Sequence, residues 1–364
     1  MVTGGSLAEV ASAIVAGGPL RFDRYLDLAL YGRHGFYTSA GRAGGRRGDF
    51  ITSPEVGPLF GAVLGRALDS CWVELGRPDT FPVIEVGAGP GTLARAVLSS
   101  APACLPALRY VAVEISAAQR SAHPPPVESR TTIPDEPVAG MVIANEFLDN
   151  LPFRLLVWDS GWREAHVDVD RNGQLVEVLL PVSEQLPRWL PKVGVHGARI
   201  PWQERATSWV GRTRAQLTEG RVIAIDYVTP TTAEIASMPW REWLRTYRGH
   251  ERGTHYLRDV GLQDITTQVA LDQLPEPDAL RTQAQFLQRW GIEDLVEAGR
   301  AAWTAAAASP DVAALRMRSR IAEAAALVDP VGLGRFVVME WSARPDAPLP
   351  GPLRSSNDSR GSRA

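Results

Sequence analysis

The pattern of apolar positions predicts helices near the N-terminus and a parallel sheet after them. Segments 7–15 and 56–75 place apolar residues at helical spacing, which is typical of amphipathic helices. From residue 82 onward, short apolar runs end in glycine or in acidic and amide side chains, as buried parallel strands do. These runs predict strands at 82–86, 110–113, 140–144 and 221–225. A late strand is predicted at 335–341, and helices are predicted at 92–99 and 202–217.

The alternation of strands and helices predicts a Rossmann-like α/β fold, in which a doubly wound sheet carries inserted segments. Turn residues at 160–161 and 172–173 predict additional strands over 154–158 and 164–180. We therefore expect a core with two inserts, preceded by a cap and followed by a disordered tail. The expected boundaries are 1–79 for the helical and loop cap, 80–342 for the core, about 154–220 and 230–330 for the inserts, and 343–364 for the tail.

Charge and composition narrow the class of protein. The net charge of −3 gives no reason to expect nucleic-acid binding. No run reaches the roughly 18–20 apolar residues that cross a bilayer, and the first twenty residues lack the features of a signal peptide. Cys71 and Cys104 lie far apart without clustered histidines, so we expect no metal site. A cytoplasmic enzyme or binding protein is predicted.

The most informative segment is 83–92, an apolar strand that runs into three glycines and then into a predicted helix. Gly87, Gly89 and Gly91 have the spacing G-x-G-x-G. A dinucleotide-binding turn needs glycine at 92, where the chain has Thr92, and a P-loop needs a lysine that this segment lacks. The loop therefore favours S-adenosylmethionine, which approaches the backbone closely without a phosphate. A nicotinamide dinucleotide is the alternative.

Acidic residues near the ends of the first two predicted strands complete the expected cofactor site. Glu114 follows the second strand, where its carboxylate can accept hydrogen bonds from ribose hydroxyls. Glu85 precedes the glycines and suits the methionine ammonium group. The expected cofactor-binding residues are Glu85, Gly87, Ala88, Gly89, Gly91, Glu114, Ile115 and Asn145.

Three separated motifs resemble those of the MidA-type methyltransferases. They are segments 48–55, 85–91 and 144–152, the last reading Ala-Asn-Glu-Phe-Leu-Asp-Asn-Leu-Pro. The family includes a mitochondrial assembly factor for respiratory NADH:ubiquinone oxidoreductase and many bacterial members. The resemblance implies the Rossmann-like sheet of class I methyltransferases and S-adenosylmethionine as cofactor. It also implies methylation of a protein arginine, with a respiratory-complex subunit as the partner.

The chain departs from the family pattern at three positions. Val228 follows Asp226-Tyr227 where the family usually has glycine, and Gln268 and Ala270 replace a usual histidine and aspartate. If those two residues contact the substrate in other members, the replacements change the substrate or the activity.

Arginine methylation requires carboxylates, because a guanidinium with a pKa above about 12 must be oriented and must lose a proton. The expected catalytic residues are Glu146, Asp149, Asp49 and Glu55. The expected substrate contacts are Thr52, Ser53, Pro54, Asp226, Tyr227 and Arg248. Structural roles compete with these: Asn145 and Asp149 can cap a turn, and Ser53 can cap a helix that begins at Pro54. Two other functions stay open, namely methylation of a small molecule at oxygen or nitrogen, and a non-catalytic assembly or binding factor.

Overall fold

The computed structural model describes residues 5–39, 52–249 and 251–343. Asp49 and the greater part of the predicted tail lie outside the described residues.

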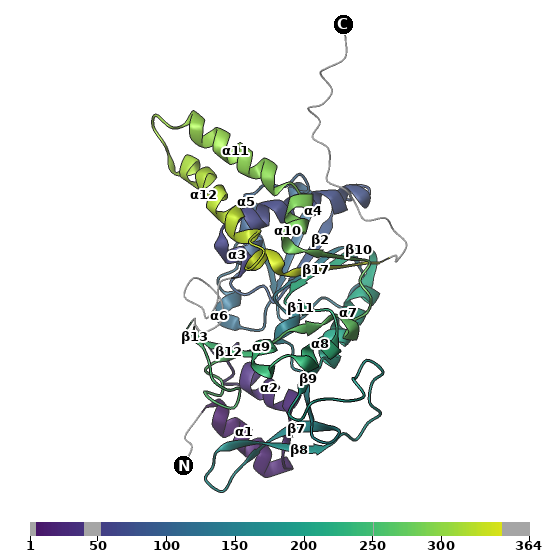
Figure 1. Cartoon of the computed structure of the whole chain (residues 1–364). Coiled ribbons are helices and arrows are strands. Elements are labelled where there is room, and N and C mark those ends of the chain that lie inside the picture. Colours follow the sequence, from purple (N-terminus) through teal and green to yellow (C-terminus); the bar gives the residue numbers. More distant parts are fainter. Residues whose placement is uncertain (1–4, 40–51, 250, 344–364) are drawn as a thin grey trace.

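A seven-stranded sheet forms the centre of the molecule and confirms the predicted Rossmann-like fold (Figure 1). Its first five strands in space are parallel, and β17 runs antiparallel between β10 and β16. In spatial order the strands are β4 (Glu128–Arg130), β3 (Leu108–Val113), β2 (Phe81–Val86), β5 (Val138–Asn145), β10 (Leu217–Asp226), β17 (Val337–Ser342) and β16 (Ala279–Thr282).

Helices cover both faces of this sheet. On one face, α4 (Pro58–Glu74), α5 (Thr92–Ser99) and α10 (Gln283–Arg289) share a core with Val83, Ile143 and Ile223. On the other face, α7 (Glu204–Gln216) packs through its buried aromatic and aliphatic residues. Although α4 falls within the segment that we expected to be a cap, its apolar face is therefore part of the main core.

A second lobe combines the N-terminus with the first insert. The helices α1 (Ser6–Gly17) and α2 (Phe22–Tyr31) share a hydrophobic core with an antiparallel sheet (Figure 1). The strands of this sheet are β1 (Leu20–Arg21), β7 (Trp162–Val169), β6 (Arg154–Trp158), β9 (Arg199–Trp202) and β8 (Leu175–Pro181). Two segments that are far apart in the sequence thus bury each other's apolar faces.

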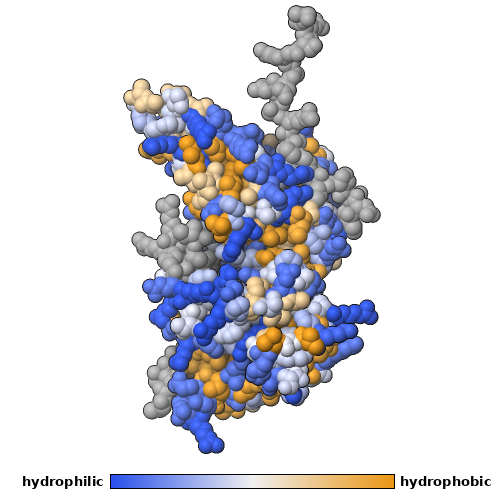
Figure 2. Space-filling model, in the orientation of Figure 1, coloured by the Kyte–Doolittle hydropathy of each residue, from blue (hydrophilic) through white to orange (hydrophobic). Residues whose placement is uncertain are grey.

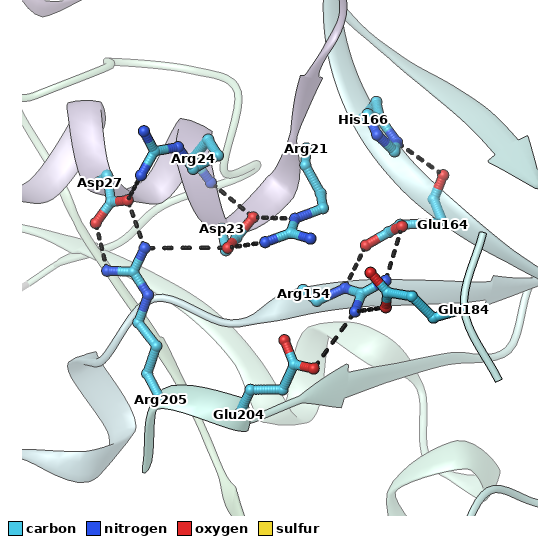
Figure 3. A network of polar contacts seen from close by, with 10 residues as sticks. All are labelled: Arg21, Asp23, Arg24, Asp27, Arg154, Glu164, His166, Glu184, Glu204 and Arg205. Carbon is cyan, nitrogen blue, oxygen red and sulfur yellow. Dashed lines mark hydrogen bonds and ion pairs between the residues drawn. The ribbon is translucent and has the colours of Figure 1, made fainter. Parts of the chain in front are cut away.

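Arg154, on the interior strand β6 of this lobe, holds a network of acidic side chains (Figure 3). Its guanidinium is 2% exposed, donates to Glu164 at 2.6 and 3.0 Å, and also contacts Glu184 and Glu204. The same group lies 4.0 Å from the centre of the Trp202 ring. Several carboxylates and an aromatic face therefore compensate for the burial of this charge.

A second ion pair in the same view joins the two lobes. Arg205, at the start of α7, donates to both carboxylate oxygens of Asp27 in α2, at 2.6 and 2.5 Å. Because α7 packs on the main sheet and α2 packs in the other lobe, this fork-like contact restrains the lobes relative to each other.

The remaining elements surround the carboxyl ends of the parallel strands or project from the core. The helices α11 and α12 form a hairpin that protrudes from the molecule (Figure 1), and Figure 2 shows apolar side chains on it. The bounds are α3 (Ser53–Val56), α6 (Ala117–Arg120), β11 (Val228–Thr229), α8 (Thr232–Ser237), α9 (Trp240–Trp243), β12 (Leu244–Arg248), β13 (Glu251–Arg252), β14 (Asp264–Thr267), β15 (Val269–Ala270), α11 (Ile292–Ala305) and α12 (Val312–Leu327), with 3-10 turns at Leu105–Ala107, Leu148–Asn150, Leu271–Gln273 and Leu333–Arg335.

Candidate active site

A cavity of about 710 Å³ opens at the carboxyl ends of β2, β3 and β5. Ligands of doubly wound sheets bind at this edge. The wall combines the glycine loop, the end of β3, one face of α7, and residues of α3 and of the N-terminal lobe. Both lobes therefore contribute to a single site.

The glycine loop brings the backbone to the cavity wall. Gly87, Gly89 and Gly91 have φ angles of +69°, +53° and +75°, a region that residues with a side chain rarely adopt. A Cβ atom at Gly87 would also lie 3.0 Å from the ring of Phe147. The G-x-G-x-G spacing thus follows from backbone conformation and from close packing.

Glu114 fastens the loop to the end of β3. One carboxylate oxygen accepts the Gly89 N–H at 3.0 Å, and the other accepts the Ser116 N–H at 2.7 Å. Burial raises the pKa of this carboxyl above its ordinary value. Each oxygen has a second lone pair, so the group can still accept hydrogen bonds from a ribose diol in the cavity.

His123 supports the loop from behind, a role that the sequence analysis missed. Its Nε2 lies 2.9 Å from the Gly89 carbonyl oxygen, and its Nδ1 lies 2.7 Å from the Ser129 hydroxyl. A single histidine between prolines and polar residues carries no recognisable pattern, so its role emerges only from the folded chain.

Glu85 lies at the base of the cavity. The Tyr110 hydroxyl donates to its carboxylate at 2.8 Å. Burial, with a smaller contribution from the charge of Glu114, raises the pKa of Glu85 to about 8. The carboxyl is therefore largely neutral at pH 7 unless a cation binds beside it.

Two amide oxygens on the wall lack partners within the described part of the chain. Asn145 Oδ1 and Asn150 Oδ1 are buried, and both residues line the cavity. Buried acceptors of this kind usually have a donor. The ammonium group of S-adenosylmethionine carries three N–H donors, so the residues present fit this cofactor.

The N-terminal segment contributes an aromatic wall that the sequence analysis did not predict. The rings of Tyr31 and Tyr37 line the cavity and stack with centroids 5.4 Å apart. The Tyr31 hydroxyl donates to the Asn150 carbonyl at 2.8 Å, and the Tyr37 hydroxyl donates to Asp264 at 2.8 Å. These bonds fix the segment against the core.

The short helix α3 is capped one residue earlier than expected. Thr52, and not Ser53, is the N-cap, and its N–H donates to Glu55 at 3.0 Å. Ser53 is fully buried, and its hydroxyl donates to Gln283 at 2.8 Å. Ser53 therefore anchors α3, whereas Thr52, Pro54 and Glu55 line the cavity.

Glu146 stands at the point where two cavities meet. It lines the large cavity and also a neighbouring one of about 100 Å³. Its φ is +50°, an uncommon conformation that the surrounding structure must maintain. Its carboxylate accepts from the Asn145 side-chain amide at 3.1 Å and from the Ser53 N–H at 3.4 Å. Burial, reinforced by Asp149, raises its pKa to about 8.

Asp226 and Arg248 do not line either cavity, in contrast to the substrate contacts expected for them. Asp226 is fully buried and accepts from the N–H groups of Leu148, Asp149 and Tyr227 at 2.8–3.2 Å. It therefore holds the turn that presents Asp149. Arg248 is more than half exposed and pairs with Asp259 at 3.0 Å.

The other predicted residues fall into three groups. The large cavity includes Glu85, Gly87, Ala88, Gly89, Glu114, Ile115, Asn145 and Glu146, together with Thr52, Pro54 and Glu55. The smaller cavity includes Glu146, Asp149 and Tyr227. Gly91 caps α5 behind the wall. The individual roles of these residues stay predictions.

Comparison with known proteins identifies relatives of this fold and site. Residues 63–288, more than half of the chain, match a family described as "Putative S-adenosyl-L-methionine-dependent methyltransferase". A Burkholderia thailandensis protein crystallised with S-adenosylhomocysteine is 28% identical, with a TM-score of 0.79. That similarity covers 96% of this chain and 93% of the other.

Several curated relatives are named as protein arginine methyltransferases, which is more specific than the description of the family. The mitochondrial protein arginine methyltransferase NDUFAF7 homolog of Drosophila melanogaster is 32% identical, over 45% of this chain and 45% of that protein. The NDUFAF7 proteins of Mus musculus and Danio rerio are 30% and 28% identical, over 49% and 80% of this chain and 49% and 78% of their own. The chain spans about half the length of the first curated relatives that it matches.

The prediction of a cytoplasmic protein is wrong, because these curated relatives are named as mitochondrial proteins. Across the parts of the chain that the structure describes, no helix combines the length and apolar composition needed to cross a bilayer.

The fold, the residues of the cavity and the similar proteins all indicate the same family and the same cofactor. The predicted resemblance to MidA-type methyltransferases is confirmed, and so is S-adenosylmethionine, rather than a nicotinamide dinucleotide, as the cofactor. The chain belongs to this family of S-adenosyl-L-methionine-dependent methyltransferases.

Proposed function

We propose that this protein transfers a methyl group from S-adenosylmethionine to an arginine side chain of a protein substrate. The observation that carries the proposal is the position of Glu146, whose carboxylate borders the cofactor cavity and the smaller cavity beside it. The curated relatives named as protein arginine methyltransferases support the same target.

Residues of the large cavity would hold the cofactor. Glu114 would accept the ribose hydroxyls, while Glu85 and the amide oxygens of Asn145 and Asn150 would face the ammonium group. When bound, the cofactor supplies an electrophilic methyl group on a sulfonium. The glycine loop allows its backbone to approach this ligand closely.

Glu146 would orient the guanidinium and take its proton. The nucleophilic nitrogen must present a lone pair to the methyl carbon at about 3–3.5 Å, and it loses an N–H proton as the new bond forms. The raised pKa of Glu146, about 8, makes its ionised form a better proton acceptor than an ordinary carboxylate. Asp149 and Glu55 border the same region and would add negative charge.

Because the proposed target is an arginine side chain of a protein, the enzyme must bind a partner protein. We propose a subunit of a respiratory complex as the first candidate, as the resemblance to MidA-type enzymes implies.

The proposal is tested by incubating the purified protein with S-adenosylmethionine and arginine-containing proteins, followed by mass spectrometry for methylarginine. We expect Glu146→Gln to reduce turnover by about 10²–10³-fold while the affinity for S-adenosylhomocysteine stays within about twofold. Glu276→Gln, at an exposed glutamate outside both cavities, is the matched control.

Two other results would each favour a different function for this protein. Turnover on small amines or hydroxyl compounds alone would indicate a small-molecule methyltransferase. Tight S-adenosylhomocysteine binding without turnover on any target would indicate a non-catalytic assembly factor.

A further inference from the structure

The smaller cavity adjoins the cofactor cavity but is chemically different from it. Glu146 lines both, and two other contacts join their walls. The ring of Tyr37 lines the large cavity while its hydroxyl donates to Asp264, which lines the small one. Asn150 and Asp149 are adjacent in the chain and line the large and the small cavity respectively. Glu146 is thus shared by the two cavities, and a group in the small cavity would lie beside it, next to the cofactor cavity.

Three carboxylates from separate elements converge on this small space. Glu146 follows β5, Asp149 belongs to the turn after it, and Asp264 begins β14. Asp149 accepts from the Thr266 hydroxyl and from the Asn150 amide, so these partners are neutral. Among the described residues that line the cavity, Arg245 is the one cation. The acidic side chains thus outnumber the basic ones by three to one.

Aromatic side chains close the remaining sides. Tyr227, Trp243 and Tyr247 line the cavity, and Arg245 already places its guanidinium 5.8 Å from the centre of the Tyr227 ring. Trp243 is fully buried, yet its indole N–H has no hydrogen-bond partner in the described chain. A buried donor without an acceptor indicates that a ligand or water completes this site.

We propose that the small cavity is the subsite for the guanidinium of the target arginine, which it binds through Glu146, Asp149 and Asp264; this assignment rests on the proposed function. A guanidinium group is planar, carries five N–H donors that can bind several carboxylates at once, and stacks on aromatic rings. An ammonium group or a neutral amide offers only some of these interactions.

The same assignment separates two of the three departures from the family pattern, those at Gln268 and Ala270. Gln268 lines the small cavity, and its side-chain oxygen accepts from the Thr229 hydroxyl. Ala270 is fully buried in the core of the N-terminal lobe and lines neither cavity. Only the replacement at 268 therefore touches the subsite, where it places a neutral side chain beside the carboxylates.

The experiment measures binding and not turnover. The protein, saturated with S-adenosylhomocysteine, is titrated by calorimetry with an arginine-containing peptide, its citrulline counterpart, its lysine counterpart and agmatine. We expect the arginine peptide to bind at least about tenfold more tightly than the citrulline peptide, because citrulline keeps the shape and loses the charge. Agmatine should bind and the lysine peptide should bind more weakly.

Two variants locate the subsite. Asp264→Asn removes one carboxylate charge, and Thr266→Met fills the cavity from the face of β14 that carries Asp264. Each should weaken the arginine peptide at least about tenfold and leave S-adenosylhomocysteine affinity within about twofold. Asp259→Asn, at an aspartate with a half-exposed side chain on the surface, is the matched control.

The outcomes distinguish the two proposals. If both variants bind the arginine peptide as tightly as the unaltered protein, or if the citrulline peptide binds equally well, the subsite is overturned, whether or not arginine is methylated. If arginine binds through these residues but no methylarginine forms, the subsite stands and the proposed function fails.

Discussion

At the scale of single residues, the site depends on carboxyl groups whose pKa values are raised by burial. Glu85 and Glu146 have pKa values of about 8, because their charged forms lose most of their hydration. A cation that approaches either group restores the charged form. Proton release is therefore coupled to the binding of the cofactor and of its target.

The affinity for S-adenosylhomocysteine is expected to rise between about pH 6 and pH 8. Below pH 8 Glu85 is mostly protonated, and the ligand's ammonium group favours its carboxylate, so binding releases a proton. The affinity then increases by up to about tenfold per pH unit and levels off above pH 8. Calorimetry in buffers of different ionisation enthalpy measures the released proton. Glu85→Gln should flatten this dependence, and an equally steep slope in that variant would assign the proton to another group.

The spacing of residues along the chain predicted some of the site residues but not others. The glycines and Glu114 lie within one strand–loop–helix unit and the strand after it, so their order along the chain reflects their order in space. Tyr37 and His123 reach the site through contacts between distant segments. No local pattern marks such residues, because tertiary packing alone gives them their neighbours.

At the scale of elements, apolar periodicity predicted four of the five parallel strands and missed β4, whose three residues are all polar. The expected helix at 92–99 coincides with α5, and the expected strand at 140–144 lies within β5. The three-stranded sheet of β12, β13 and β14 was missed, because its short strands carry few apolar residues and pair across intervening loops. Assigning α4 to a cap was also a misjudgement of packing, since its periodicity predicts a helix but not the surface that it covers.

The Arg154 network provides a test of how the second lobe is stabilised. Arg154→Met should lower the free energy of unfolding by about 3–5 kcal/mol, because Glu164 would keep a buried charge without its cation. Arg163→Met, on the exposed side of β7, should change it by less than about 0.5 kcal/mol. Urea titration followed by circular dichroism compares the two variants. Equal midpoints would mean that burial of the Glu164 carboxylate does not depend on Arg154.

At the scale of the whole molecule, the cofactor cavity links two lobes with separate cores. Tyr31 and Tyr37 approach it from the lobe built on α2, whereas Glu114 and Trp209 approach it from the main sheet. The Arg205–Asp27 pair crosses the same boundary. A ligand in the cavity therefore touches both halves of the protein at once.

Hydrogen exchange should record this link. Adding S-adenosylhomocysteine is expected to slow amide exchange in the glycine loop, in α7 and also in α2, although α2 packs in the other lobe. The turn between α11 and α12 lines neither cavity and should exchange at an unchanged rate. Protection restricted to the main-sheet lobe would show that the two lobes respond independently.

The left-handed backbone conformation of the glycine loop also limits which substitutions the protein can accept there during evolution. Every amino acid that a single base change can substitute for glycine brings a side chain. At Gly91 the new Cβ would meet His123 and Pro124 at 3.1 Å, in a conformation that itself costs about 1–2 kcal/mol. Every single-base change that alters Gly87, Gly89 or Gly91 therefore puts a side chain on left-handed backbone. Mutations that spread freely through the exposed loops of this chain would be removed here first, and the loop should persist after most of the surrounding sequence has changed.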